Sequence, residues 1–150
     1  MENAVADAMG KLGGAAVLGL CALGSALGSG AAALAAIGAW KKCYAQNRLA
    51  PFILLAFVGA PLSQTIYGMI IMNRIVASTQ AGAPWQTLAA AGVFGGTAIG
   101  ASAWLQGMAG AAASDALGET GKGTANYLMA LGIIETVAIF VLVFISKVIG

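Results

Sequence analysis

Charged residues divide the chain into long apolar intervals. Four intervals stand out, at about 12–40, 49–73, 85–114 and 123–146, and only the last contains a charged residue, Glu135. Each is long enough for an α-helix to cross a membrane, which takes about 20 apolar residues. The intervals are rich in Ala, Gly and Leu and lack strict alternation, so the strands of a membrane barrel are disfavoured. The pattern predicts an all-α membrane protein with four transmembrane helices.

The composition excludes several classes of protein. Of the 150 residues, 60% are hydrophobic and 8% are charged, and the mean hydropathy is +0.91. A soluble domain carries about 25% charged residues, and a disordered chain is polar. A net charge of +2 leaves no basic stripe for nucleic-acid phosphates. The chain contains no His, and the spacing of Cys21 and Cys43 matches no zinc or redox motif, so we expect both cysteines to be packing residues.

The distribution of Lys and Arg predicts the orientation. The loops between spans 1 and 2 and between spans 3 and 4 carry four such residues, and the opposite side carries three. The positive-inside rule therefore favours cytoplasmic 1–2 and 3–4 loops, with both termini outside the cell membrane. The small-residue stretch near residue 30 is also typical of a signal peptide. However, Glu2 and Asp7 replace the usual basic start, so we expect the segment to be retained.

The two halves of the chain resemble each other. Residues 24–30 align with residues 96–102 at an offset of 72, and residues 64–66 align with residues 135–137 at an offset of 71. Chance similarity between Ala/Gly-rich helices is the alternative explanation. The preserved order and the near-constant offset favour a tandem duplication. We therefore predict one hairpin over residues 1–76, an extracytoplasmic linker at 77–84, and a second hairpin over residues 85–150.

Spans 1 and 3 carry glycines at helical spacing. Gly24 and Gly28 form one GxxxG pair, and Gly92, Gly96 and Gly100 form two more in series. Small residues four apart share a helix face and let another backbone approach closely. A generic four-helix bundle would use the same device. With the bulkier side chains of spans 2 and 4, the pattern favours an inner layer of spans 1 and 3 and an outer layer of spans 2 and 4.

Glu135 lies near the middle of span 4. A charge at the bilayer centre costs at least about 2.5–3.5 kcal/mol. We therefore interpret Glu135 as a functional-site candidate, and a structural, hydrogen-bonded carboxyl is the alternative. When it is protonated or bound to a cation, the site is neutral and can face lipid. When it is empty and ionised, it cannot do so cheaply. This difference provides a basis for carrying an ion across the membrane.

Neighbouring polar residues indicate which ion. Pro61 should distort span 2 and free backbone carbonyls, close to Ser63 and Gln64, while span 3 supplies Gln106. Hydroxyl, amide, carbonyl and carboxylate oxygens with a single negative charge suit a hard monovalent cation such as Na⁺. A proton would need only Glu135 and one partner. In that case Gln64 and Gln106 would be ordinary interhelical hydrogen-bonding residues.

Three short strings carry a family resemblance. They are Pro61-Leu62-Ser63-Gln64-Thr65-Ile66-Tyr67, Leu105-Gln106-Gly107 and Ile134-Glu135-Thr136. In this order they resemble the sodium-binding pattern of the membrane rotor (proteolipid, c or K) subunit of V-type and A-type rotary ATPases, in the bacterial Na⁺-transporting branch. The resemblance covers nearly the whole chain. It implies that Glu135 carries the ion and that Tyr67 donates its hydroxyl to Glu135 and locks the site. The Na⁺ ligands that it implies are Glu135, Gln106, Gln64, Ser63 and the main-chain carbonyl of Ala60.

The resemblance also implies an assembly. Identical copies would form a ring in lipid that turns against a static membrane subunit bearing an arginine, with a central stalk at the cytoplasmic loops. ATP would be hydrolysed or made in a separate soluble head. This chain would be no enzyme and would bind no nucleotide, in keeping with its lack of a GxxxxGK[ST] loop. The alternatives are a proton-translocating rotor subunit of the same family, a small four-helix cation or drug antiporter, and a structural four-span protein.

Overall fold

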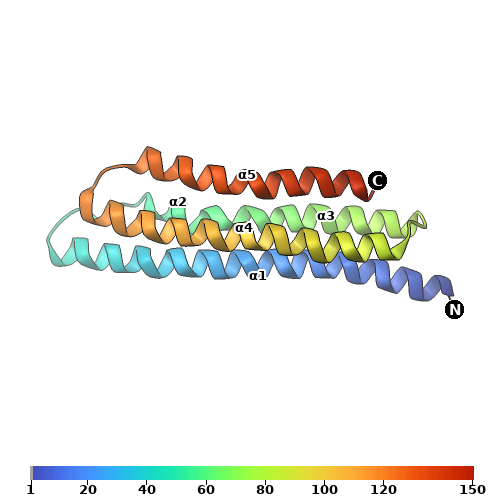
Figure 1. The fold of residues 1–150 in the computed structure, drawn as a ribbon. Coiled ribbons are helices and arrows are strands. Elements are labelled where there is room, and N and C mark those ends of the chain that lie inside the picture. Colours follow the sequence, from blue (N-terminus) through green and yellow to red (C-terminus); the bar gives the residue numbers. More distant parts are fainter. Residues whose placement is uncertain (1) are drawn as a thin grey trace.

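The computed structural model describes the backbone of residues 2–150 and the side chains from residue 4 onward. It contains the helices α1 (Glu2–Ala45), α2 (Leu54–Gly59), η1 (Ala60–Leu62), α3 (Ser63–Gln80), α4 (Trp85–Thr120) and α5 (Thr124–Val148) (Figure 1). Because α2, η1 and α3 run on as one rod, the described chain has four helices long and apolar enough to cross a membrane. The predicted all-α membrane fold is confirmed.

The helices run beyond the predicted spans. The first helix continues past Lys41 and Lys42 to Ala45, and the second continues through Gln80 into the expected linker. Charged residues mark where the lipid ends, whereas a helix satisfies its own backbone and can continue into water. The reversal before α4 is confined to residues 81–84, where Gly82 adopts a positive φ of 81° that favours glycine. Both chain ends lie at the end of the bundle that contains this reversal (Figure 1).

The second span is broken at the predicted proline. Pro61 lies in the single 3₁₀ turn η1, between the α-helical segments α2 and α3. Proline lacks an N–H and crowds the preceding turn, so a tighter turn here is the expected response. The break sets the direction of α3, on which the polar residues Ser63, Gln64 and Tyr67 lie.

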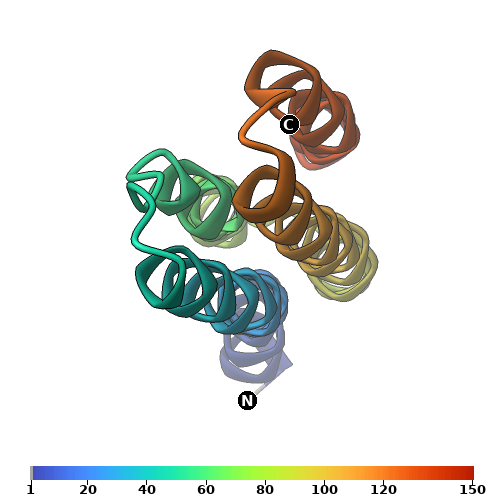
Figure 2. The ribbon, with the colours of Figure 1, turned by 90° about the vertical axis from the view of Figure 1, so that its left-hand side faces the viewer.

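Helices α1 and α4 pack backbone against backbone. A Cβ at Gly13 would lie 2.6 Å from the carbonyl oxygen of Leu88, and one at Gly96 would lie 2.9 Å from the Cα of Val17. A Cβ at four further glycines would collide with backbone of the facing helix, at Gly24 against Gly100, Gly28 against Ala103, Gly92 against Gly13, and Gly100 against Leu20. Glycine at these positions therefore allows a helix approach that no other residue permits. Figure 2 shows the two rods side by side.

The register between α1 and α4 is constant. The thiol of Cys21 donates weakly to the Gly96 carbonyl at 3.9 Å, and that of Cys43 donates to the Gly118 carbonyl at 3.8 Å, both across a separation of 75 residues. Residues 24–30 align with residues 96–102 in the sequence at an offset of 72, so relative to that alignment α1 and α4 pack with a slip of about one helical turn. The slip brings Gly24 against Gly100 rather than against Gly96, its counterpart in the sequence.

The remaining helices cover this pair unequally. Helix α3 packs on α1 and α4, while α5 lies on the far side of α4 and is the most exposed of the four spans (Figure 2).

Two clusters of buried side chains hold the layers together. One centres on Val17, Ile71 and Ile99, and the other on Phe57 and Leu117.

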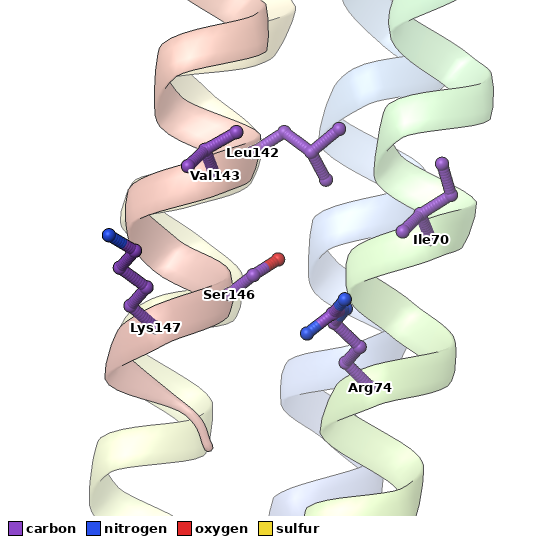
Figure 3. A pocket seen from close by; sticks show the side chains of 6 residues that line it. All are labelled: Ile70, Arg74, Leu142, Val143, Ser146 and Lys147. Atoms are coloured by element: carbon purple, nitrogen blue, oxygen red, sulfur yellow. The ribbon is translucent and has the colours of Figure 1, made fainter.

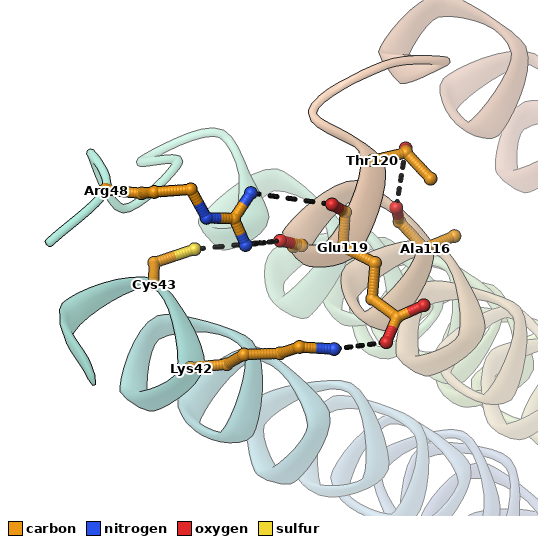
Figure 4. Close-up of polar contacts among 7 residues, drawn as sticks. Lys42, Cys43, Arg48, Ala116, Glu119 and Thr120 are labelled. Carbon is orange, nitrogen blue, oxygen red and sulfur yellow. Dashed lines mark hydrogen bonds and ion pairs between the residues drawn. The ribbon is translucent and has the colours of Figure 1, made fainter. Parts of the chain in front are cut away.

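A polar cluster, called the latch below, joins the two hairpins at the end of the bundle that holds the 1–2 and 3–4 loops. It consists of Lys42, Arg48, Gly118 and Glu119. Arg48 donates from Nη2 to the Gly118 carbonyl at 2.9 Å and from Nη1 to the Glu119 carbonyl at 3.4 Å (Figure 4). Lys42 forms an ion pair with Glu119. The guanidinium thus satisfies carbonyls at the C-terminal end of α4 that have no partner within the helix, where a cation also favours the helix dipole. Gly121 ends the helix with a positive φ of 64°.

Candidate ion-binding site

Glu135 lies at the middle of α5 and is half-buried. The hydroxyl of Tyr67, from α3, donates to its Oε1 at 2.8 Å. The amide of Gln106, from α4, donates to its Oε2 at 3.4 Å. Both carboxylate oxygens therefore face polar groups from other helices, and three helices meet at this carboxylate.

Two glutamines connect the carboxylate to the interior of the bundle. The side chains of Gln64 and Gln106 are both fully buried. Gln64 Nε2 donates to Gln106 Oε1 at 2.7 Å, and Gln106 Nε2 also donates to the Leu131 carbonyl at 3.0 Å. Buried amides need such partners because an unmatched one costs about 1–3 kcal/mol. Their placement side by side concentrates amide groups at one level of the membrane interior.

The break at Pro61 positions the far end of the network. Ser63 begins α3 directly after the 3₁₀ turn, and its hydroxyl lies 3.1 Å from the carbonyl oxygen of Ala60. The same hydroxyl lies 3.1 Å from Gln64 Oε1. Three oxygens from residues 60–64 thus cluster next to the glutamine pair.

All the residues singled out by sequence around Glu135 therefore lie in one continuous hydrogen-bonded network. It runs from Ala60 through Ser63, Gln64 and Gln106 to Glu135 and Tyr67. The network holds one carboxylate, and no Lys or Arg pairs with Glu135 among the described side chains. Nor does the described chain hold a group of three or more His, Cys, Asp or Glu residues that could bind a metal together. Chemically, the arrangement can be neutralised by one proton or one monovalent cation.

One residue of this region was not anticipated from the sequence. Ser102, on α4, donates its hydroxyl to the Ile134 carbonyl at 2.9 Å, next to Glu135. It lies four residues before Gln106, hence on the same helix face. A lone serine in an Ala/Gly-rich helix carries no motif, and only this spacing to Gln106 could have revealed it. The bond fixes α5 against α4 at the level of the carboxylate.

The second half of the chain matches a known protein family. Residues 89–145 match the family model of the ATP synthase C subunit. The match covers less than half of the chain, so it is a similarity of this segment to that family. The segment contains Ser102, Gln106 and Glu135, whereas the site residues of α3 lie outside the match. No curated protein matches the chain significantly.

With four candidate spans among the described residues, the chain is a multi-pass membrane protein.

Proposed function

We propose that this chain is the ion-carrying rotor-ring subunit of a V-type or A-type rotary ATPase and that it binds Na⁺ at Glu135. The observation that carries the proposal is the hydrogen-bonded network that joins Glu135 to two buried glutamines and to Ser63, directly after the 3₁₀ turn of the second span. A bare proton carrier would need the carboxyl and one partner. The extra hydroxyl, amide and carbonyl oxygens have the composition of a coordination shell for a hard cation.

The proposed ligands are five oxygen atoms. They are a carboxylate oxygen of Glu135, the amide oxygens of Gln106 and Gln64, the hydroxyl of Ser63 and the carbonyl of Ala60. An entering ion would replace the Gln64–Gln106 amide hydrogen bond and the Ser63 hydroxyl contact. Such interhelical bonds contribute about 0.6 kcal/mol each within membranes, so little is lost when they are exchanged for bonds to a cation. Tyr67, bonded to Glu135 Oε1, would hold the carboxylate in the binding orientation.

The transport cycle follows from charge. With Na⁺ bound, the site is neutral and can rotate past lipid; emptied, it leaves a carboxylate whose exposure costs at least about 2.5–3.5 kcal/mol. We propose that the arginine of a static membrane subunit stabilises the emptied site and displaces the ion. Each ion moved against the potential requires about 2.3 kcal/mol per 100 mV. Coupling to ATP hydrolysis or synthesis would pass through a central stalk.

The proposed topology places the latch end of the bundle in the cytoplasm. The 1–2 and 3–4 loops then face the stalk, and both termini are extracytoplasmic, in line with the small excess of Lys and Arg in these loops. The Arg48 and Lys42 contacts join both loops into one rigid end. A rigid end is what a stalk needs to transmit torque to the ring.

The experiment is carbodiimide labelling of Glu135 in the purified ring at fixed pH and ionic strength, with Na⁺ or K⁺ added. Carbodiimides react with a protonated carboxyl in an apolar setting, so bound Na⁺ should block the reaction. We expect Na⁺ to slow the labelling and K⁺ to leave it unchanged. E135Q should abolish labelling, and D115N, which removes an exposed acid, should retain it.

Other outcomes separate the rival functions. If labelling responds to pH but not to Na⁺, the site carries protons and the glutamines serve helix packing. If the detergent-solubilised protein is a small oligomer rather than a ring of many copies, a small antiporter replaces the rotor proposal.

A further inference from the structure

A second surface feature lies on the outer helices, between the ion site and the chain termini. It is a groove between α3 and α5 (Figure 3), lined by Ile70, Arg74, Leu142, Val143, Ser146 and Lys147. Its walls are tied together at both ends. The Tyr67–Glu135 bond closes the end toward the ion site, and Ser78 donates to the Ile149 carbonyl at 2.8 Å at the other. The groove is therefore held open between two fixed points.

The groove carries positive charge at the end near the termini. Arg74 and Lys147 are exposed, and neither forms an ion pair with any side chain from residue 4 onward. Asp7, an acid at this end of the bundle, is already paired with Lys11 at 2.8 Å. Figure 3 shows Arg74 and Ser146 pointing into the space between the two helices. Two cations and a hydroxyl that lack an acidic partner among the described side chains favour an anion.

The depth of these residues distinguishes one source of anion from another. Along the helix, Arg74 lies seven residues from Tyr67, about 10 Å, and Lys147 lies twelve residues from Glu135, about 18 Å. Half the hydrocarbon core is about 15 Å thick, so a mid-membrane ion site places both cations near the headgroup boundary. On each helix an apolar residue of the groove lies nearer the ion site than the cation does, Ile70 four residues before Arg74 and Leu142 five residues before Lys147. The cationic end of the groove matches an anionic headgroup, and its apolar part matches the acyl chain of the same lipid. Free phosphate would contact the cationic end alone.

We propose that this groove binds one anionic phospholipid. The phosphate lies between Arg74 and Ser146, Lys147 adds charge beside it, and an acyl chain lies along Ile70 and Leu142. The site is independent of which ion Glu135 carries, and it would anchor the outer face of each subunit at a fixed depth in the bilayer. Juxtamembrane cations gain about 1 kcal/mol each from anionic lipid, which is about fivefold in relative affinity per charge.

The test uses the assembled full-length protein in phosphatidylcholine vesicles. Trace spin-labelled phosphatidylglycerol or spin-labelled phosphatidylcholine is added, and electron paramagnetic resonance measures the immobilised fraction of each. We expect phosphatidylglycerol to be preferred by the wild type. The double variant R74Q/K147Q should lose about fivefold of that preference for each charge removed. K11Q, which removes a paired cation at the same end of the bundle, should keep the preference.

Two further measurements make the outcome decisive. Raising KCl on the wild type should reduce the preference, because salt screens exposed charges; this arm does not depend on the folding of a variant. A preference unchanged by KCl or by R74Q/K147Q overturns the proposal. Displacement of the labelled lipid by millimolar inorganic phosphate would also overturn it, since the site would then recognise a free anion.

Discussion

Replacing Gln106 with leucine removes the central amide of the site and keeps nearly the same side-chain volume. The wild-type amide makes three contacts: it accepts from Gln64 at 2.7 Å and donates to the Leu131 carbonyl at 3.0 Å and to Glu135 at 3.4 Å. Because the side chain is fully buried, none of these partners regains water when the amide is lost. The variant therefore tests whether this residue is an ion ligand or an interhelical contact.

The two possible roles of Gln106 predict effects of different size for Q106L. As an interhelical contact, its three bonds contribute about 0.6 kcal/mol each, so Q106L should lose about 2 kcal/mol of stability from the bonds themselves. As an ion ligand, its oxygen contributes about 1.5–3 kcal/mol, typical of a polar contact to a charge. That is a tenfold to roughly hundredfold weaker affinity for Na⁺. The variant should therefore assemble normally and require at least about tenfold more Na⁺ for protection.

The assay for Q106L is the Na⁺ concentration that halves the rate of carbodiimide labelling of Glu135, measured beside ring assembly in detergent. Q86L is the matched control, since Gln86 lies on the same helix but is exposed and outside the network. We expect Q86L to behave as the wild type. An assembled Q106L ring that Na⁺ protects at the wild-type concentration would refute the reasoning and return Gln106 to a packing role.

Three other predictions concern the packing, the latch and the charge of the site. G100A should lower the free energy of unfolding of the protein in detergent by about 1–3 kcal/mol, because its Cβ would collide with the backbone of α1. The control G19A places a Cβ with no neighbour within 4 Å, so it should be neutral or slightly stabilising. R48Q should speed hydrogen exchange of the amides at the loop end roughly twofold to fivefold, because the end of α4 loses its cation; unchanged exchange would contradict the latch. Q64E should place a second carboxyl in the network, so mass spectrometry should find carbodiimide adducts at both Glu135 and residue 64. An adduct at Glu135 alone would show that the new carboxyl stays ionised.

Much of the fold follows from where charges are absent. A span free of charge must be helical in lipid, so the number of helices and the break at Pro61 are predictable. The extent of α1 is not, because residues beyond Lys41 are helical for local reasons and leave no mark in the hydropathy pattern. The position of Arg48 against Gly118 is set by the packing of two hairpins, 70 residues apart, and no local pattern encodes it.

The residues of the candidate site were predictable as a set, and so was the bond from Tyr67 to Glu135, but the bond between the two glutamines was not. Glu135 is conspicuous because a charge in an apolar run is costly, and the glutamines stand out for a similar reason. Ser102 was missed because a hydroxyl among alanines costs little and gives no signal. The slip of about one turn between α1 and α4 was also hidden, since the offset of 72 residues comes from aligning the two halves of the sequence, whereas the observed offset of 75 describes packing.

The predicted duplication would explain why the site draws on both hairpins. At equivalent positions the first hairpin has Gln64 and the second has Glu135, and Gln106 lies hydrogen-bonded to both. Two carboxylates at these positions would be linked through a single buried amide, where like charges repel and each adds the cost of a charge in the membrane. With one neutral and one acidic residue, a single monovalent cation balances the whole four-helix unit. On this proposal, divergence of two duplicated halves would turn a pair of similar hairpins into one neutral carrier, and in the proposed ring each chain would carry one ion for every four helices.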